Sequence, residues 1–155
     1  MTTIANARIL TLDPSLGDGP LGVIDRGWIR FKNERVEEVR AGDPVGSADI
    51  NANGRLLMPA FVDCHTHACW AGDRTDEWAA RLAGASYIEL LEAGGGIMST
   101  VRAVRAASQQ ELADLLLERL RTMLALGTTV VEVKSGYGLS TDDELKMLRA
   151  IADAG

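Results

Sequence analysis

The sequence predicts an α/β fold whose strands run parallel, preceded by a separate β-rich segment. Two observations lead to this prediction. After residue 57, an apolar strand, a series of helices, a second apolar strand and a final helix follow one another along the chain. This order is typical of parallel strands that share a sheet and are joined by helical crossovers. The first 57 residues instead alternate short β-rich runs with turn residues.

The sequence of the first 57 residues predicts a small β-sandwich or one sheet of a larger β-sandwich. Tight turns rich in glycine, proline, asparagine and aspartate separate short runs that favour strands. Strands packed at this density are typical of all-β modules. Nothing in this part indicates catalysis. The expected strands cover residues 4–12, 22–25, 28–32 and 35–40.

The second part, from residue 58, predicts alternating strands and helices. A Ser-x-x-Glu pattern occurs twice, at Ser86 and at Ser108. In such a capping box the serine and glutamate side chains bind the free amide groups of a first helical turn. The expected elements are strands 58–67 and 128–134 and helices 75–82, 86–92, 109–126 and one from residue 141.

The sequence predicts a long amphipathic helix over residues 109–126. Its apolar residues recur at intervals of three and four, which places them on one face. Gly127 supplies a left-handed end for this helix. The expected apolar stripe comprises Leu112, Leu115, Leu116, Leu120, Met123 and Leu124.

Composition and charge argue against several classes of function. The chain has 155 residues, of which 46% are hydrophobic, and a net charge of -6, which argues against binding nucleic acid. No window reaches the roughly 18 apolar residues that a membrane span needs, so no membrane partner is expected. The amino terminus lacks the features of a signal peptide. Two cysteines are too few for a disulfide framework, and the expected location is cytoplasmic.

The histidines are the best candidates for a metal site. His65 and His67 are the only two in the chain, and their i, i+2 spacing puts both on one face of a strand. Two such imidazoles can bind one metal ion at about 2.0–2.1 Å. A His-x-His pair also arises without function in many proteins. Its place at the end of an apolar strand, expected to be buried, favours the metal site, because parallel sheets bind ligands there.

The residues around the histidines allow more than one interpretation. Cys64 lies on the opposite face of the strand, where a packed thiol is expected. Asp63 shares the face of the histidines. It either orients an imidazole or is a polar strand residue bonded to the backbone. The glycines at 94–96 indicate a flexible loop near the site, because no Gly-Lys-Ser/Thr follows them to form a phosphate cradle.

Four stretches resemble a known group of enzymes. Residues 59–67, Pro-Ala-Phe-Val-Asp-Cys-His-Thr-His, are similar to the first barrel strand of the amidohydrolase superfamily. Its members are metal-dependent (β/α)8 barrels that carry a small β-sandwich. Residues 71–74, 84–102 and 131–139 narrow the resemblance, which runs from about residue 4 to 155, to the imidazolonepropionase family. It implies a partial TIM-type barrel over residues 58–155, preceded by a small β-sandwich portion over 1–57.

The resemblance implies roles for four residues. His65 and His67 match two ligands of one metal ion, zinc or iron, and no other catalytic residue is expected in this segment. Arg74 and Tyr137 match residues that bind substrate; without the resemblance they would be a solvated arginine and a packed loop aromatic. A guanidinium can bind the propionate tail of the substrate through two parallel hydrogen bonds. Lys134 matches no metal-bridging lysine, which belongs to a later strand, so an ion pair is expected.

The implied activity is hydrolysis of the cyclic amide of 4-imidazolone-5-propanoate to N-formimidoyl-L-glutamate in the degradation of histidine. Such a barrel takes about 250 residues, and zinc catalysis needs three protein ligands. The remaining ligands and the acid/base residues are therefore expected beyond Gly155, and the isolated segment is expected to be inactive. The alternatives are another cyclic amidase or deaminase of the superfamily, or a non-catalytic interaction module. A homodimer is one assembly that exposed sheet edges would allow.

Overall fold

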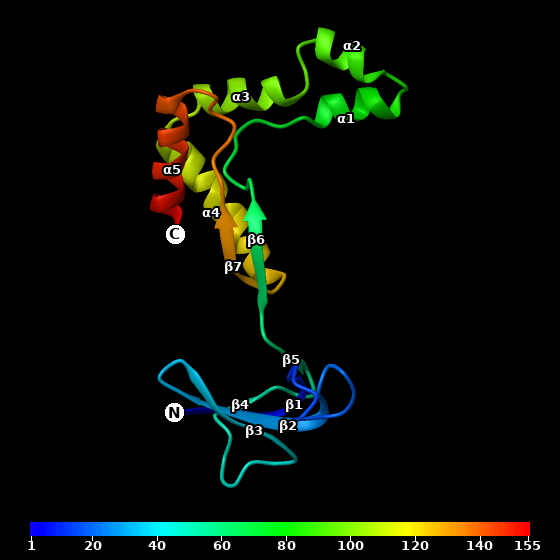
Figure 1. Ribbon diagram of the computed structural model, residues 1–155, viewed down its shortest axis with the longest axis vertical. Helices are drawn as coiled ribbons and strands as arrows, with labels where there is room; N and C mark the ends of the chain where they lie inside the picture. Colours follow the sequence, from blue (N-terminus) through cyan, green and yellow to red (C-terminus); the bar gives the residue numbers. More distant parts are fainter. The chain divides into compact units, whose positions relative to one another are not determined.

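The computed structural model describes residues 1–155, which form two compact units, Met1–Ala60 and Phe61–Gly155. The division lies close to the boundary predicted after residue 57. Whether these units are portions of a β-sandwich and of a barrel stays a prediction. Figure 1 shows a β-sheet unit and a unit that combines helices with two strands, β6 and β7.

The amino-terminal unit is a single open sheet. Strand β1 pairs antiparallel with β2 and, along its other edge, parallel with β4 and β5, while β3 extends the sheet beyond β2. Alternate residues of β1, namely Ala5, Ala7 and Ile9, are buried, as the period of two requires. The strands are β1 (Thr2–Leu10), β2 (Val23–Lys32), β3 (Arg35–Ala41), β4 (Ile50–Asn51) and β5 (Leu56–Leu57).

Strand β2 is continuous where the sequence indicated two separate runs. Gly27 lies in its middle, and a Cβ there would be 2.6 Å from the carbonyl oxygen of Arg40. The glycine therefore interrupts the β-rich pattern without interrupting the strand, because the neighbouring strand approaches too closely for a side chain.

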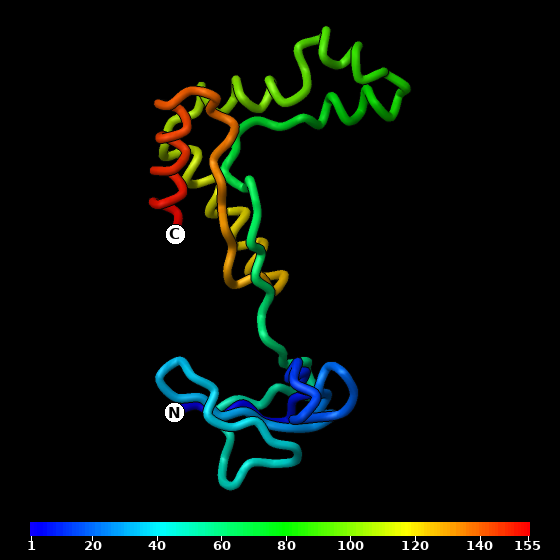
Figure 2. The backbone as a smooth tube through the Cα atoms, in the orientation of Figure 1, coloured from blue at the N-terminus to red at the C-terminus, as the bar shows by residue number.

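The second unit contains two parallel strands and five helices. Strands β6 and β7 pair in parallel, which confirms the arrangement predicted from the order of the elements. Figure 2 traces the chain from β6 through four helices back to β7. The elements are β6 (Phe61–Thr66), α1 (Thr75–Leu82), α2 (Tyr87–Glu92), α3 (Ile97–Ala106), α4 (Gln109–Ala125), β7 (Thr128–Val133) and α5 (Thr141–Ala154).

The helix ends follow the sequence signals closely, with one exception. Both capping boxes are present, at Ser86 before α2 and at Ser108 before α4. Helix α3 was not predicted. It follows Gly96, which offers no side chain to cap it, and it buries only Val101 and Val104, so neither a start signal nor a long apolar stripe marks it. No helix combines the length and apolar character needed to cross a membrane.

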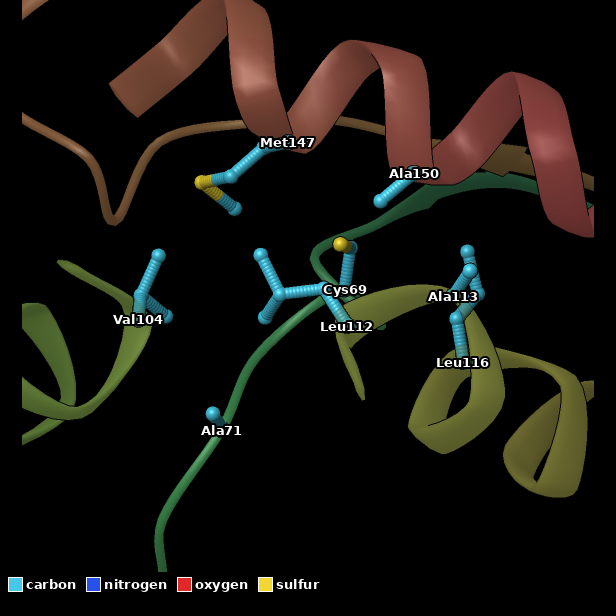
Figure 3. Packing of buried hydrophobic residues seen from close by; sticks show 8 residues of the cluster. All are labelled: Cys69, Ala71, Val104, Leu112, Ala113, Leu116, Met147 and Ala150. Atoms are coloured by element: carbon cyan, nitrogen blue, oxygen red, sulfur yellow. The ribbon is translucent and has the colours of Figure 1, made fainter. Parts of the chain in front are cut away.

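The core of this unit lies between α3, α4, α5 and the segment that follows β6. Leu112, Leu116 and Met147 are fully buried in it together with smaller residues (Figure 3). Lys146 of α5 adds a polar tie, because its Nζ donates to three backbone carbonyls at the end of α3, each at 3.0 Å. These carbonyls have no partner within the helix, so the lysine caps it.

Strand β6 is exposed, and the prediction of a buried strand is wrong for this chain. Phe61 is 56% and Val62 66% exposed, and Cys64 is exposed rather than packed. The reason is that α4 packs against β7, whereas β6 has β7 as its only strand neighbour. An apolar strand sequence shows that its side chains favour burial, but other elements of the fold must pack over the strand to bury them.

Candidate metal and substrate site

The two histidines lie together where β6 ends. His65 is the penultimate residue of β6, and His67 lies just beyond the end of the strand. Their ring centroids are 5.5 Å apart and their planes are inclined by 62°. Both side chains are exposed. The ring of His67 also lies 5.8 Å from that of Tyr137. The carboxyl ends of two parallel strands thus bring three predicted site residues into one place.

The loop after β7 carries Tyr137 between two glycines that the packing requires. Gly136 has φ +148°, and a Cβ there would be 3.0 Å from Cε1 of His67. At Gly138 a Cβ would be 2.6 Å from the backbone nitrogen of Glu144. The first glycine lets the loop approach the imidazole, and the second lets it approach α5.

Glu144 of α5 holds this loop in place. Its Oε1 accepts hydrogen bonds from the amides of Gly138 and Leu139, both at 2.8 Å. Burial alone would raise the pKa of Glu144, but the hydroxyl of Ser135 and the loop amides together lower it. The carboxylate therefore stays ionised and organises the backbone around Tyr137. Sequence analysis did not identify Glu144, because an acid near a helix start is ordinary.

Two neighbours of the histidines take structural roles. Asp63 Oδ1 accepts a hydrogen bond from the backbone nitrogen of His65 at 3.3 Å, so of the two interpretations the bond to the backbone holds. Lys134 Nζ lies 2.7 Å from Oε1 of Glu132, which confirms the predicted ion pair. The hydrogen bond from Lys134 is the main reason that the pKa of Glu132 is lowered.

Arg119 of α4 fixes the segment that follows the histidines. Its NH1 donates to the carbonyls of Ala68 and Trp70, at 2.9 and 2.8 Å. Its guanidinium also stacks on the Trp70 ring, 3.7 Å from the ring centroid. Between these residues Cys69 is fully buried, and burial raises the pKa of its thiol. The backbone directly after His67 is therefore anchored on a helix.

Arg74 is an ion-paired residue at the start of α1 rather than a free surface arginine. Its Nε and NH2 both donate to Oε2 of Glu77, at 2.9 and 2.7 Å. The hydrogen bond to Glu77 is the main reason that the pKa of Arg74 is raised. No hydrogen bond or ring contact joins Arg74 to the histidines. It lines a separate cavity of about 270 Å³ together with Trp78, Arg81 and Tyr87.

The glycines at 94–96 form a turn that is held by hydrogen bonds, and its flexibility stays a prediction. The amide of Gly96 donates to Oε2 of Glu77 at 3.0 Å, and Arg102 donates to the carbonyl of Gly94. A Cβ on Gly95 would be 2.9 Å from Cδ of Glu77. Gly95 lets the backbone approach this carboxylate, whereas Gly94 and Gly96 have positive φ, +85° and +75°.

The histidine pair fits part of a metal site. Imidazole nitrogen suits both zinc and iron, and two rings project from one end of a parallel sheet. No group of three or more histidine, cysteine, aspartate or glutamate side chains gathers to hold a metal ion. A catalytic zinc ion takes three protein ligands, so this chain alone supplies an incomplete set.

Comparison with known proteins gives many relatives of one kind, although no family model matches the chain. An imidazolonepropionase from Sphingopyxis alaskensis is 49% identical over 148 residues, which covers 94% of this chain and 36% of the relative. One from Symbiobacterium thermophilum is 63% identical over 137 residues, or 83% of this chain and 32% of the relative. One from Haloarcula marismortui is 52% identical over 139 residues, or 88% and 33%. The chain is a homologue of imidazolonepropionases.

The imidazolonepropionase relatives are much longer than this chain, which spans about a third of their length. Among solved structures, a prolidase complexed with N-methylphosphonate-L-proline has a TM-score of 0.56 at 20% identity, over 86% of this chain and 26% of its own. An uncharacterised protein has a TM-score of 0.56 at 20% identity, over 87% and 26%. These likenesses support the α/β fold class over part of a larger protein.

Proposed function

We propose that the polypeptide containing this chain hydrolyses the cyclic amide of 4-imidazolone-5-propanoate to N-formimidoyl-L-glutamate, a step in the degradation of L-histidine to glutamate. The observation that carries the proposal is the match to imidazolonepropionases, at about half identity over nearly the whole chain. The chain contributes two metal ligands and two residues that bind substrate. The finer architecture belongs to the same proposal: β6 and β7 as the first two strands of a (β/α)8 barrel and the amino-terminal sheet as part of a β-sandwich.

His65 and His67 would hold a single zinc or iron ion. The proximity of their rings, their exposure at the strand ends and the absence of any competing acid bridge to either imidazole support this role. When bound, such an ion activates water for attack on an amide carbonyl. The remaining ligands would come from outside these residues. An imidazole binds a metal ion in its neutral form, so protons compete with the ion for both side chains.

Arg74 and Tyr137 would bind and orient the substrate. Glu77 uses one edge of the Arg74 guanidinium, and the other edge is free to pair with the propionate carboxylate. Tyr137 stands beside His67, where its hydroxyl could donate to an oxygen of a ring held near the metal. The two free cysteines support a reducing, cytoplasmic setting.

The proposal is tested on the full-length polypeptide. Loss of imidazolonepropanoate absorbance should accompany formation of N-formimidoylglutamate, identified by mass spectrometry. Chelation should abolish turnover, and zinc or iron should restore it. His67→Ala should lower kcat/KM by several orders of magnitude, whereas Cys64→Ala, on the opposite face of the same strand, should change it little.

Two results would decide against the proposal. Turnover of a different cyclic amide or of an amino-substituted ring, without turnover of imidazolonepropanoate, would favour another enzyme of the superfamily. Full activity of a polypeptide lacking both imidazoles would remove the metal assignment. The isolated 155 residues are expected to be inactive, because they lack a third ligand.

A further inference from the structure

We infer that Glu77 is a positioning residue, which orients the guanidinium of Arg74 so that its free edge receives the carboxylate of the substrate. The inference rests on the proposed function, because it concerns the residue that would bind the propionate. Three features support the inference: the hydrogen bonds to Glu77, the N–H donors that remain free on the guanidinium, and the glycine turn that encloses the acid.

The first feature is that three N–H groups converge on one oxygen of Glu77. Its Oε2 accepts from Nε of Arg74 at 2.9 Å, from NH2 of Arg74 at 2.7 Å and from the amide of Gly96 at 3.0 Å. The side chain of Glu77 is only 16% exposed, compared with 47% for Arg74. The acid is therefore the fixed member of the pair, and the arginine takes its orientation from it.

The second feature is what remains on the guanidinium. Arginine carries about five N–H donors in a rigid plane, and Glu77 takes the edge formed by Nε and NH2. The end of the plane, formed by NH1 and the second hydrogen of NH2, donates to no protein atom. Two parallel N–H groups on such an edge match the two oxygens of a carboxylate. Glu77 and a substrate can thus bind Arg74 at the same time.

The third feature is the enclosure of the acid. Residues 94–96 close over Glu77, and a side chain at Gly95 would collide with its Cδ at 2.9 Å and with the carbonyl oxygen of Leu90 at 2.8 Å. The amide of Gly96 binds the same oxygen of Glu77 that Arg74 binds, so the backbone of the turn helps to hold the acid in place. The glycine stretch that distinguishes this sequence therefore has a specific purpose, which is to hold one carboxylate under a hydrogen-bonded backbone.

The charge of the adjoining cavity suits an anion. Glu77 is the only acid among its lining residues, which include Arg74 and Arg81. The hydrogen bond from Arg74, followed by that from Gly96, lowers the pKa of Glu77, so it stays ionised and paired. Glu77 neutralises the charge of Arg74, and Arg81 adds one positive charge. The net positive charge of this lining suits one small carboxylate.

The test compares Glu77→Gln with Glu92→Gln, a matched change on the exposed surface of α2, both in the full-length polypeptide. Glu77→Gln should raise KM for imidazolonepropanoate by about 10-fold, the size of one hydrogen bond to a charged group, with little change in kcat. A substrate whose tail ends in an uncharged amide should show no such difference. Glu92→Gln should behave as the unsubstituted protein on both substrates.

A double-mutant cycle separates positioning from folding. If Glu77 acts through Arg74, then Glu77→Gln should have no further effect on KM in an Arg74→Ala background. In addition, the amide resonance of Gly96 should shift with pH in the unsubstituted protein as the Glu77 carboxylate titrates, and should lose that shift in Glu77→Gln.

The outcomes distinguish this inference from the proposed function. Equal losses by Glu77→Gln on the charged and uncharged substrates, or additive effects with Arg74→Ala, would overturn the inference and leave the function standing. If the unsubstituted polypeptide does not turn over imidazolonepropanoate at all, the proposed function falls and the inference falls with it.

Discussion

Replacing Gly136 by alanine tests whether the loop after β7 shapes the position of the His67 imidazole. A Cβ at this position would lie 3.0 Å from Cε1 and 3.2 Å from Nδ1 of His67, and the residue has φ +148°. The substitution therefore has two separable effects. One is backbone strain, and the other is contact with a proposed metal ligand.

The two effects have different magnitudes. A residue other than glycine in such a sparsely populated backbone region costs about 1–3 kcal/mol. Carbon contacts at optimal separation lie near about 3.5–4.0 Å, so the ring must move by roughly half an ångström. Because the His67 side chain is exposed, it can move, and the contact should affect metal binding more than folding. Disturbing the support of a metal ligand typically lowers affinity by about 10–100-fold.

Gly84→Ala is the matched control. Gly84 also has positive φ, +103°, but a Cβ there would meet nothing within 4 Å. Urea unfolding should show a loss of about 1–3 kcal/mol for both variants. Zinc affinity of the full-length polypeptide, measured by competition with a coloured chelator, should fall only in Gly136→Ala. Equal zinc affinity in the two variants would refute the argument that the loop positions the imidazole.

Two further predictions concern stability. Leu112→Ala, at a fully buried site, should lower the free energy of unfolding by about 2–5 kcal/mol, whereas Leu124→Ala on the same helix, 59% exposed, should cost much less; urea denaturation compares them. Glu111 has a lowered pKa, chiefly through the backbone hydrogen bond from Ser108, so it stabilises α4 above its ordinary pKa of about 4.3 and loses this as pH falls through the lowered value. The destabilisation caused by Glu111→Gln at pH 7 should therefore fade in strong acid, and a loss that is independent of pH would contradict the capping role.

Features of the fold that depend on neighbouring residues could be predicted from the sequence. The bounds of α1 agree, and both capping boxes form, because each depends on residues a few positions apart. The parallel pairing of β6 and β7 followed from the order of the elements. Helix α3 was missed because glycine precedes it. The exposure of β6 was not predicted, because the burial of a strand depends on the segments that pack against it.

The candidate site shows the same distinction. His65, His67 and Tyr137 were identified from short motifs, and the structure places them together. The residues that hold Arg74 and the segment after the histidines were not identified. Glu77, the partner of Arg74, binds a turn 19 residues away, and Arg119 binds carbonyls 49 and 51 residues away. The chain contains 22 aspartates and glutamates and 16 lysines and arginines, and no local pattern marks the few that bind distant backbone.

The Glu144 side chain comes from α5 but binds the loop that carries Tyr137. The local stability of the start of this helix is therefore coupled to that of the loop. Amides bonded to it, those of Gly138 and Leu139, can exchange with solvent only when the start of α5 opens or the side chain leaves. The loop and the helix start should then behave as one cooperative unit in hydrogen exchange. Fraying at the front of α5 would therefore loosen the Tyr137 ring beside the two histidines.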